Sequence, residues 1–239
     1  MNGRFLPPNI QHDMKILHIE TSSRNCSVAI SDGDELLCLC EEVSENYKQS
    51  ESLHTFVEWA LEGAGIALKD LDAVSLGMGP GSYTGLRIGS SAAKGFCYGL
   101  QIPLIAVNSL ETMIEPFLDQ NFDFIIPLLD ARRMEVYTAH FDGNSGQMLT
   151  QTEAKIIDQN SFHEFLGKKV VFVGDGASKA KEILQLPDAE FNPDVYPSAK
   201  FLIKKASEKF RNRDFEDVAY FEPFYLKEFQ GLKKKKTED

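Results

Sequence analysis

The stretch "GMGPGSYTGLRIGSSAAKGF", residues Gly77 to Phe96, places glycines and a proline where an apolar strand turns into a helix. The residues that allow tight turning and close backbone approach are Gly79, Gly81 and Gly85, and those that can cap the helix are Ser82 and Thr84. Such a loop suits a phosphate group, but it is not a P-loop, because no Gly-Lys-Ser/Thr sequence ends it. The loop therefore predicts an α/β fold and leaves open whether it holds a ligand or positions the helix.

The chain before and after this loop predicts alternating strands and helices. "KILHIETSS" is a strand ending at Glu20, and "CSVAISDG" and "ELLCLCEEV" continue it as a β-meander. Apolar residues at helical spacing predict a helix over Ser50–Ala64, and a second helix follows the glycine loop over Thr84–Leu100. The strand "IPLIAVNS" closes this half.

The second half repeats this layout, which indicates a duplication. "FIIPLLDARRMEVYTAHFDGNSGQML" again has an apolar strand, an acidic residue, a turn with arginine and a second strand, so that Asp130 takes the place of Glu20. A strand, a loop and a helix follow in "KKVVFVGDGASKAKEIL", where the loop Gly174, Asp175 and Gly176 is a second candidate ligand loop. We expect two lobes with a cleft between them.

The expected domains follow from this repeat. They are an extension over residues 1–13, a first, partner-docking lobe over 14–113, a second lobe over 114–229 and a polybasic tail over 230–239. The tail contains Lys233 to Lys236, and either a solvated end or an RNA contact explains it.

Composition narrows the class of protein. With 43% hydrophobic and 26% charged residues, the 239-residue chain resembles an ordinary globular protein. Its net charge of −11 opposes unaided binding to nucleic acid. No apolar run approaches the about 18 residues of a membrane span, and the first residues lack a signal peptide's apolar core, so we expect a cytoplasmic protein without membrane contact. The four cysteines form no CxxC pair, so we expect neither a disulfide nor a metal site.

The combination of "ILHIETSS", "GMGPGSYTGLRIGSSAAKGF", "LLDARRMEVY" and "VGDG", in this order, resembles the TsaB (YeaZ-like) family over about Met14 to Phe229. The resemblance implies a two-lobed, duplicated actin-like ATPase (ASKHA, ribonuclease H-like) fold with mixed sheets. It also implies a role in forming the threonylcarbamoyl modification beside the anticodon of tRNA. In that family this type of protein is the non-catalytic scaffold and activator that dimerises with TsaD, the catalytic subunit, and an ATPase called TsaE joins them.

The residues agree with a non-catalytic role. Catalytic relatives hold a metal through a His-x-x-x-His pair after the glycine-loop helix and the next strand. The corresponding segment here is "VNSLETM", with Ser109 and Met113 at the two positions. Two alternatives stay open: an independent ATPase or small-molecule kinase of this superfold, and a glycoprotease-type peptidase, for which we find neither a metal pair nor a nucleophile with its base.

A nucleotide cleft in this chain would be degenerate. Glu20 stands where the family has aspartate, so it either reaches a magnesium-bound water or caps the neighbouring turn through backbone N–H groups. The candidate cleft residues are Glu20, Gly79, Gly81, Ser82, Asp130, Gly174, Asp175 and Gly176. Around Asp130, Arg132 and Arg133 form either a solvated turn or a polar patch at the cleft or a partner surface. We expect no cofactor of the chain's own and leave open ATP or ADP at the partner interface.

The two helices are the expected docking face. Gly85, Gly89 and Ala93 form a stripe of small residues four apart, which packs closely either on the chain's own sheet or on a partner helix. The candidate interface residues are Phe56, Trp59, Arg87, Ser90, Ala93, Lys94, Cys97 and Tyr98. The expected partners are a TsaD-like subunit, a TsaE-like ATPase, tRNA through the complex, and a second copy of the chain when the partner is absent.

Overall fold

The computed structural model describes residues 14–44 and 49–227, so the expected extension over 1–13 and the polybasic tail lie outside the described residues. The first sheet contains β1 (Lys15–Glu20), β2 (Asn25–Asp32), β3 (Glu35–Val43), β4 (Ala73–Gly77) and β5 (Leu104–Val107). The second contains β6 (Phe124–Asp130), β7 (Glu135–Thr138), β9 (Glu153–Ile156), β10 (Val170–Val173) and β11 (Glu190–Asn192), and β8 (Phe141–Asp142) pairs with β6.

Helices and 3-10 turns connect these strands. The α-helices are α1 (Gln49–Ala64), α2 (Tyr83–Leu100), α3 (Glu111–Ile114), α4 (Ala177–Ile183) and α5 (Ile203–Asn212). The 3-10 turns are η1 (Leu68–Asp70), η2 (Glu115–Phe117), η3 (His163–Phe165) and η4 (Ala199–Leu202). No helix in the described ranges is both long enough and apolar enough to cross a membrane.

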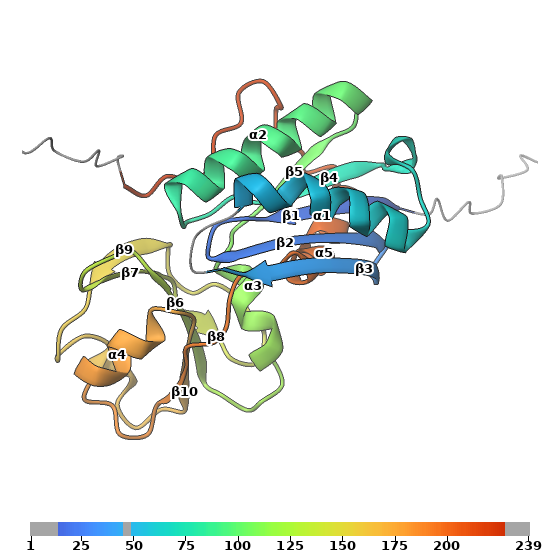
Figure 1. The fold of residues 1–239 in the computed structure, drawn as a ribbon. Coiled ribbons are helices and arrows are strands. Elements are labelled where there is room, and N and C mark those ends of the chain that lie inside the picture. Colours follow the sequence, from blue (N-terminus) through green and yellow to red (C-terminus); the bar gives the residue numbers. More distant parts are fainter. Residues whose placement is uncertain (1–13, 45–48, 228–239) are drawn as a thin grey trace, which may run out of the picture.

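The two sheets repeat one topology. The first has the order β3-β2-β1-β4-β5, and the second, read from its other edge, has the order β9-β7-β6-β10-β11. In both, a three-stranded antiparallel meander continues into two parallel strands. The predicted duplicated α/β fold with two mixed sheets is therefore confirmed, and β1 and β6 occupy equivalent places in the two lobes (Figure 1).

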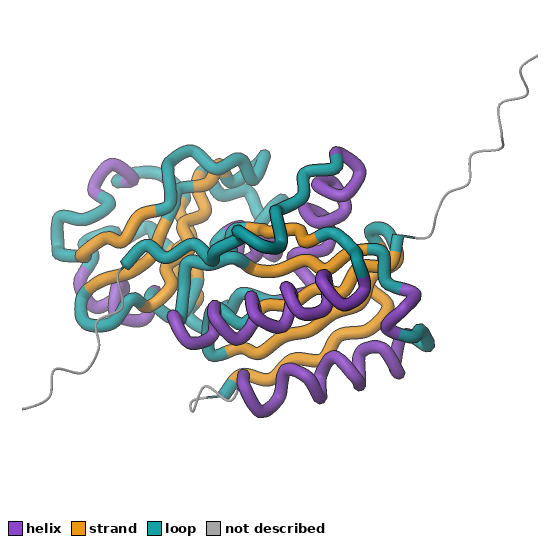
Figure 2. Tube along the Cα trace, turned by 90° about the horizontal axis from the view of Figure 1, so that it is seen from above, coloured by secondary structure: helices purple, strands orange, loops and turns teal. Residues whose placement is uncertain are grey.

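Helices cover both faces of the first sheet. Alternating residues of β1 separate the faces: Leu17 and Ile19 pack with α1 and α2, whereas Ile16 packs on the opposite face with η4 and α5. Figures 1 and 2 show α1 and α2 side by side across one face of this sheet. The lobe is thus a three-layer structure with a core on each side of the sheet.

The C-terminal part of the chain corrects the expected domain boundary. The sequence order assigns Ala199–Asn212 to the second lobe, but Ala199, Leu202 and Ala206 pack against the first sheet. Ser198 adds a hydrogen bond to Glu41 on β3 at 2.6 Å. The physical reason is that the second face of the first sheet carries the apolar side chains of Ile16, Ala29 and Ile105, and this segment supplies the helix that covers them.

Candidate functional site

Glu20 ends β1 and is fully buried between the glycine loop and Ser109. Its Oε1 accepts the N–H of Ser22 at 2.8 Å, and its Oε2 accepts the hydroxyl of Ser109 at 2.9 Å. Burial raises the pKa of this carboxyl, and the hydrogen bonds from Ser22 and Ser109 oppose the rise. Glu20 thus caps the turn after β1, as one of its two sequence interpretations predicts.

The glycine loop packs against this turn without a gap. A Cβ on Gly81 would lie 2.2 Å from the carbonyl oxygen of Ser22, and one on Gly85 would lie 2.0 Å from that of Thr21. The N–H of Ser82 donates to the Ser22 carbonyl at 2.6 Å, and the Ser82 hydroxyl caps α2 by accepting the N–H of Gly85. The glycines therefore serve close contact of the chain with itself at this point.

The second-lobe candidates gather around the end of β6. The carboxylate of Asp175 accepts the N–H of Asp130 at 2.8 Å, and burial raises the pKa of Asp175. Gly174 has a φ of 114° and lies against the carbonyl of Leu128, where a Cβ would come within 2.5 Å of the oxygen. Gly176 contacts the same carbonyl. These residues form one compact turn system.

The segment from Ser109 to Met113 joins the two groups. Besides Glu20, the Ser109 hydroxyl contacts the N–H of Gly79 at 3.1 Å, and Ser109 is fully buried. Met113 is also fully buried, and its Cε lies beside Gly174 of the second lobe. Of the two positions that correspond to the histidine pair, Ser109 thus holds the first lobe's inner loops together, and Met113 contacts the second lobe. Within the described ranges, no three His, Cys, Asp or Glu residues are grouped so as to hold a metal ion.

Four of the eight expected docking residues are buried, so the prediction that they form a docking surface is wrong for them. Ala93 is fully buried and Cys97 is 2% exposed, and both belong to the core under α2. Ser90 and Phe56 are buried as well. The small-residue stripe of α2 faces the chain's own sheet, because Gly85 and Gly89 pack directly on Thr21.

The other expected docking residues remain on the outside of the two helices. Trp59 on α1 is 56% exposed and Tyr98 on α2 is 76% exposed. Arg87 is exposed and lies over the ring of Tyr83 at 4.7 Å. Lys94 is half-buried and donates to the carbonyl oxygens of Ala219 and Phe221. This surface stays the predicted docking face, with Trp59 and Tyr98 as its large side chains.

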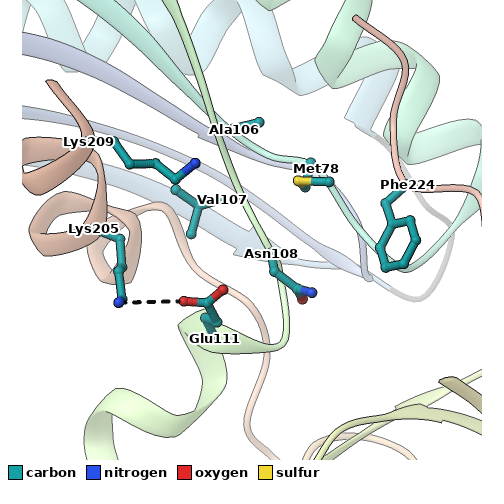
Figure 3. Close-up of a pocket in the computed structure, with 8 residues that line it drawn as sticks. All are labelled: Met78, Ala106, Val107, Asn108, Glu111, Lys205, Lys209 and Phe224. Atoms are coloured by element: carbon teal, nitrogen blue, oxygen red, sulfur yellow. Dashed lines mark ion pairs between the residues drawn. The ribbon is translucent and has the colours of Figure 1, made fainter. Parts of the chain in front are cut away.

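A cavity of about 200 Å³ lies where the ends of β4 and β5 meet α3 and α5 (Figure 3). Its lining residues are Met78, Ala106, Val107, Asn108, Glu111, Lys205, Lys209 and Phe224. Figure 3 shows the ion pair between Lys205 and Glu111, whose charged atoms are 3.8 Å apart. Sequence reasoning does not find this cavity, because its walls come from segments far apart in the chain.

Sequence reasoning also missed two residues that organise the candidate site. Ser22 lies between Glu20 and Gly81, and Lys179 on α4 donates to Asp130 and to the carbonyl oxygens of Arg133 and Glu135. The serine could have been found as a small polar residue after the strand-ending glutamate. Nothing in the sequence around Lys179 indicates its role, because α4 and the β6–β7 hairpin come together only in the folded chain.

Comparisons with known proteins agree on one family. A family model described as TsaD: tRNA N6-adenosine threonylcarbamoyltransferase matches residues 41–230. The chain is 31% identical over 238 residues to the tRNA threonylcarbamoyladenosine biosynthesis protein TsaB of Escherichia coli, which covers 92% of this chain and 98% of that protein. The chain belongs to the TsaB family.

Further relatives support this membership. TsaB of Bacillus subtilis is 34% identical over 182 residues, covering 72% of this chain and 76% of that protein. A crystal structure from Pseudomonas aeruginosa, described as similar to the peptidase YeaZ, superposes with a TM-score of 0.79 at 25% identity over 90% of this chain and 100% of that chain. TsaB proteins function in tRNA threonylcarbamoyladenosine biosynthesis, and this is the pathway of the present chain.

Proposed function

We propose that this chain is the non-catalytic scaffold and activator of the complex that forms N6-threonylcarbamoyladenosine in tRNA, and that it dimerises with a TsaD-like catalytic subunit in the cytoplasm. The observation that carries the proposal is the packing of Ser109 and Met113, which are fully buried and contact Glu20 and Gly174. Neither side chain is a good ligand for a hard or borderline cation, and both have structural partners instead. The catalytic metal therefore belongs to the partner subunit.

The first lobe does not fit a phosphate group of its own. Carbonyl oxygens of Thr21 and Ser22 face the glycine loop at contact distance, and the Ser82 N–H, which would face a phosphate, already donates to Ser22. A buried Glu20 carboxylate beside them would repel an anion. ATP or ADP accordingly binds at the partner interface or on a TsaE-like ATPase. The chain reaches tRNA in the complex and pairs with a second copy when the partner is absent.

Reconstitution tests the non-catalytic role. The purified chain, given unmodified tRNA, ATP, threonine and bicarbonate or the preformed carbamoyl adenylate, should form no modified adenosine. Product should appear when the TsaD-like and TsaE-like proteins are added, and should disappear when this chain alone is omitted. Robust product from the isolated chain would contradict the proposal and favour an independent enzyme.

The docking face is tested on the same components. Replacing Trp59 and Tyr98 with alanine should weaken binding to the TsaD-like subunit by about tenfold or more, because large aromatic side chains dominate interface energies. Ile156 is 72% exposed on β9 of the second sheet, whereas α1 and α2 cover the first sheet, so Ile156→Ala is a control that should leave binding unchanged. Melting temperatures should match wild type in all three variants.

A further inference from the structure

Two adjacent arginines at the tip of the β6–β7 hairpin have an unusual backbone. Arg132 and Arg133 have φ angles of 70° and 53°, in the left-handed region. Side chains with a Cβ adopt this region reluctantly, and glycine or asparagine is the usual residue there. Strained backbone of this kind persists only where the surroundings determine it, and it concentrates at functional positions.

The hairpin is held in this conformation from two sides. The Asp130 carboxylate accepts the N–H of Arg132 at 2.9 Å, and Lys179 donates to the Arg133 carbonyl oxygen at 2.9 Å. Lys227, from the end of the described chain, donates to the carboxylate of Glu135 at the start of β7. Segments far apart in the sequence thus fix the backbone of the tip.

These contacts leave the two guanidinium groups available. Both arginines are exposed, and no hydrogen bond or ion pair with a residue of the described ranges holds either guanidinium. The two carboxylates of the hairpin, Asp130 and Glu135, already form ion pairs with Lys179 and Lys227. The tip is therefore a local, rigidly mounted positive charge on a chain whose net charge is −11.

We propose that Arg132 and Arg133 bind the phosphate backbone of the tRNA substrate, so that the chain contributes a direct RNA contact to the complex. This inference rests on the proposed function, which supplies the tRNA. Guanidinium groups match phosphate oxygens with two parallel hydrogen bonds, and such contacts position an RNA without reading its sequence. A phosphate contact requires only exposed donors on a rigid support, and the two guanidinium groups meet this requirement.

The test replaces the arginines with glycine, which suits their backbone angles. Arg132→Gly, Arg133→Gly and the double variant are titrated with unmodified tRNA at several salt concentrations, both as the full chain alone and in complex with the TsaD-like subunit. The double variant should bind about tenfold or more weakly, and its plot of log affinity against log salt should be shallower by about 1 to 2, as expected for one or two lost phosphate contacts. Its melting temperature should be unchanged or higher.

Arg213 provides a matched control. It is also exposed, has a φ of 56° and follows α5 on the first lobe. Arg213→Gly therefore removes one charge and relieves one left-handed residue, as either single variant does, and it should leave tRNA binding and its salt dependence close to wild type. Arg132→Lys and Arg133→Lys should preserve the salt dependence and lose part of the affinity. Lysine keeps the positive charge but lacks the planar guanidinium that donates two parallel hydrogen bonds.

Several results would overturn the proposal. Unchanged tRNA affinity and salt dependence in the double variant, or an equal loss in Arg213→Gly, would do so. Loss of binding to the TsaD-like subunit with tRNA binding by the isolated chain intact would assign the tip to a protein contact instead. If the chain forms no complex with the TsaD-like subunit, the proposed function fails separately, and the titration of the chain alone still decides whether these arginines bind RNA.

Discussion

At the residue scale, His18 is a buried group whose charge state the fold controls. It lies in the middle of β1, is fully buried, and its ring nitrogens are 3.1 Å from the Ser75 hydroxyl and 2.8 Å from the Ser31 hydroxyl. Burial lowers the pKa of His18 from 6.5 to about 3. The folded chain therefore keeps this imidazole neutral at pH values where an unfolded chain protonates it.

This pKa predicts an acid-sensitive fold. Stability from His18 is fully present above pH 6.5 and is lost as the pH falls towards about 3, because only the unfolded state takes up the proton in that range. The slope is about 1.4 kcal/mol per pH unit for one group. In urea unfolding between about pH 4 and pH 6.5, the difference in stability between wild type and His18→Asn should change with this slope.

An exposed histidine supplies the comparison for this measurement. His54 lies on the outer side of α1, so His54→Asn removes a histidine without removing the buried hydroxyl contacts. Parallel profiles for His18→Asn and wild type would show that the imidazole is not held neutral.

At the element scale, α2 packs directly against the turn that follows β1. Its small residues bring the helix against the turn after β1, where Thr21 Oγ1 donates to the Gly85 carbonyl at 2.8 Å. The helical period predicted the bounds of α1 and α2 to within one residue, because the period depends on neighbours in sequence. It did not predict that Ala93 and Cys97 face inward, because a small-residue stripe suits the chain's own sheet and a partner helix equally well.

One substitution at two places on α2 tests this packing. In Gly85→Ala the new Cβ would meet the backbone oxygen of Thr21 at 2.0 Å, whereas at Gly95 nothing lies within 4 Å. Gly85→Ala should lower the free energy of unfolding by about 2 kcal/mol or more, and Gly95→Ala should raise it by roughly 0.5 to 1 kcal/mol. Similar effects at both sites in thermal and urea unfolding would mean that α2 does not pack against the Thr21 turn.

At the scale of the whole molecule, the repeat of the two sheets could be predicted from the sequence. The packing of Ala199–Asn212 on the first sheet could not. Glu20 and Asp130 end equivalent strands, and this correspondence is visible in the sequence because each half repeats the same pattern of strand, acidic residue and turn. The destination of Ala199–Asn212 depends on which face of which sheet remains uncovered. That is a long-range property, and sequence order alone points to the wrong lobe.

The crossing of the chain from the second lobe to the first predicts that the lobes unfold together. Near the crossing, Arg24 donates to the hydroxyl of Tyr196 at 2.8 Å, and the Asn25 side chain donates to the Pro197 carbonyl at 3.0 Å. Beyond it, Leu202 and Ile203 are buried. Calorimetry of the full chain should give one transition whose calorimetric and van't Hoff enthalpies agree, since neither lobe's sheet is covered without the other part of the chain.

Two truncations compare the loss of everything after Pro197, including Phe221 of the core under α1 and α2, with the loss of the last nine residues. Ending the chain at Pro197 removes the cover from Ile16, Ala29 and Ile105 on the first sheet, together with the bond from Ser198 to Glu41. Each large apolar side chain lost with it is worth roughly 2 kcal/mol of burial, so Leu202 and Ile203 alone represent a large part of a typical stability of about 5 to 15 kcal/mol. This truncation should abolish the single transition, whereas removing Gly231–Asp239, which lies outside the described residues, should leave the melting temperature unchanged. A cooperative transition in the chain that ends at Pro197 would mean that the first lobe folds without its second covering layer.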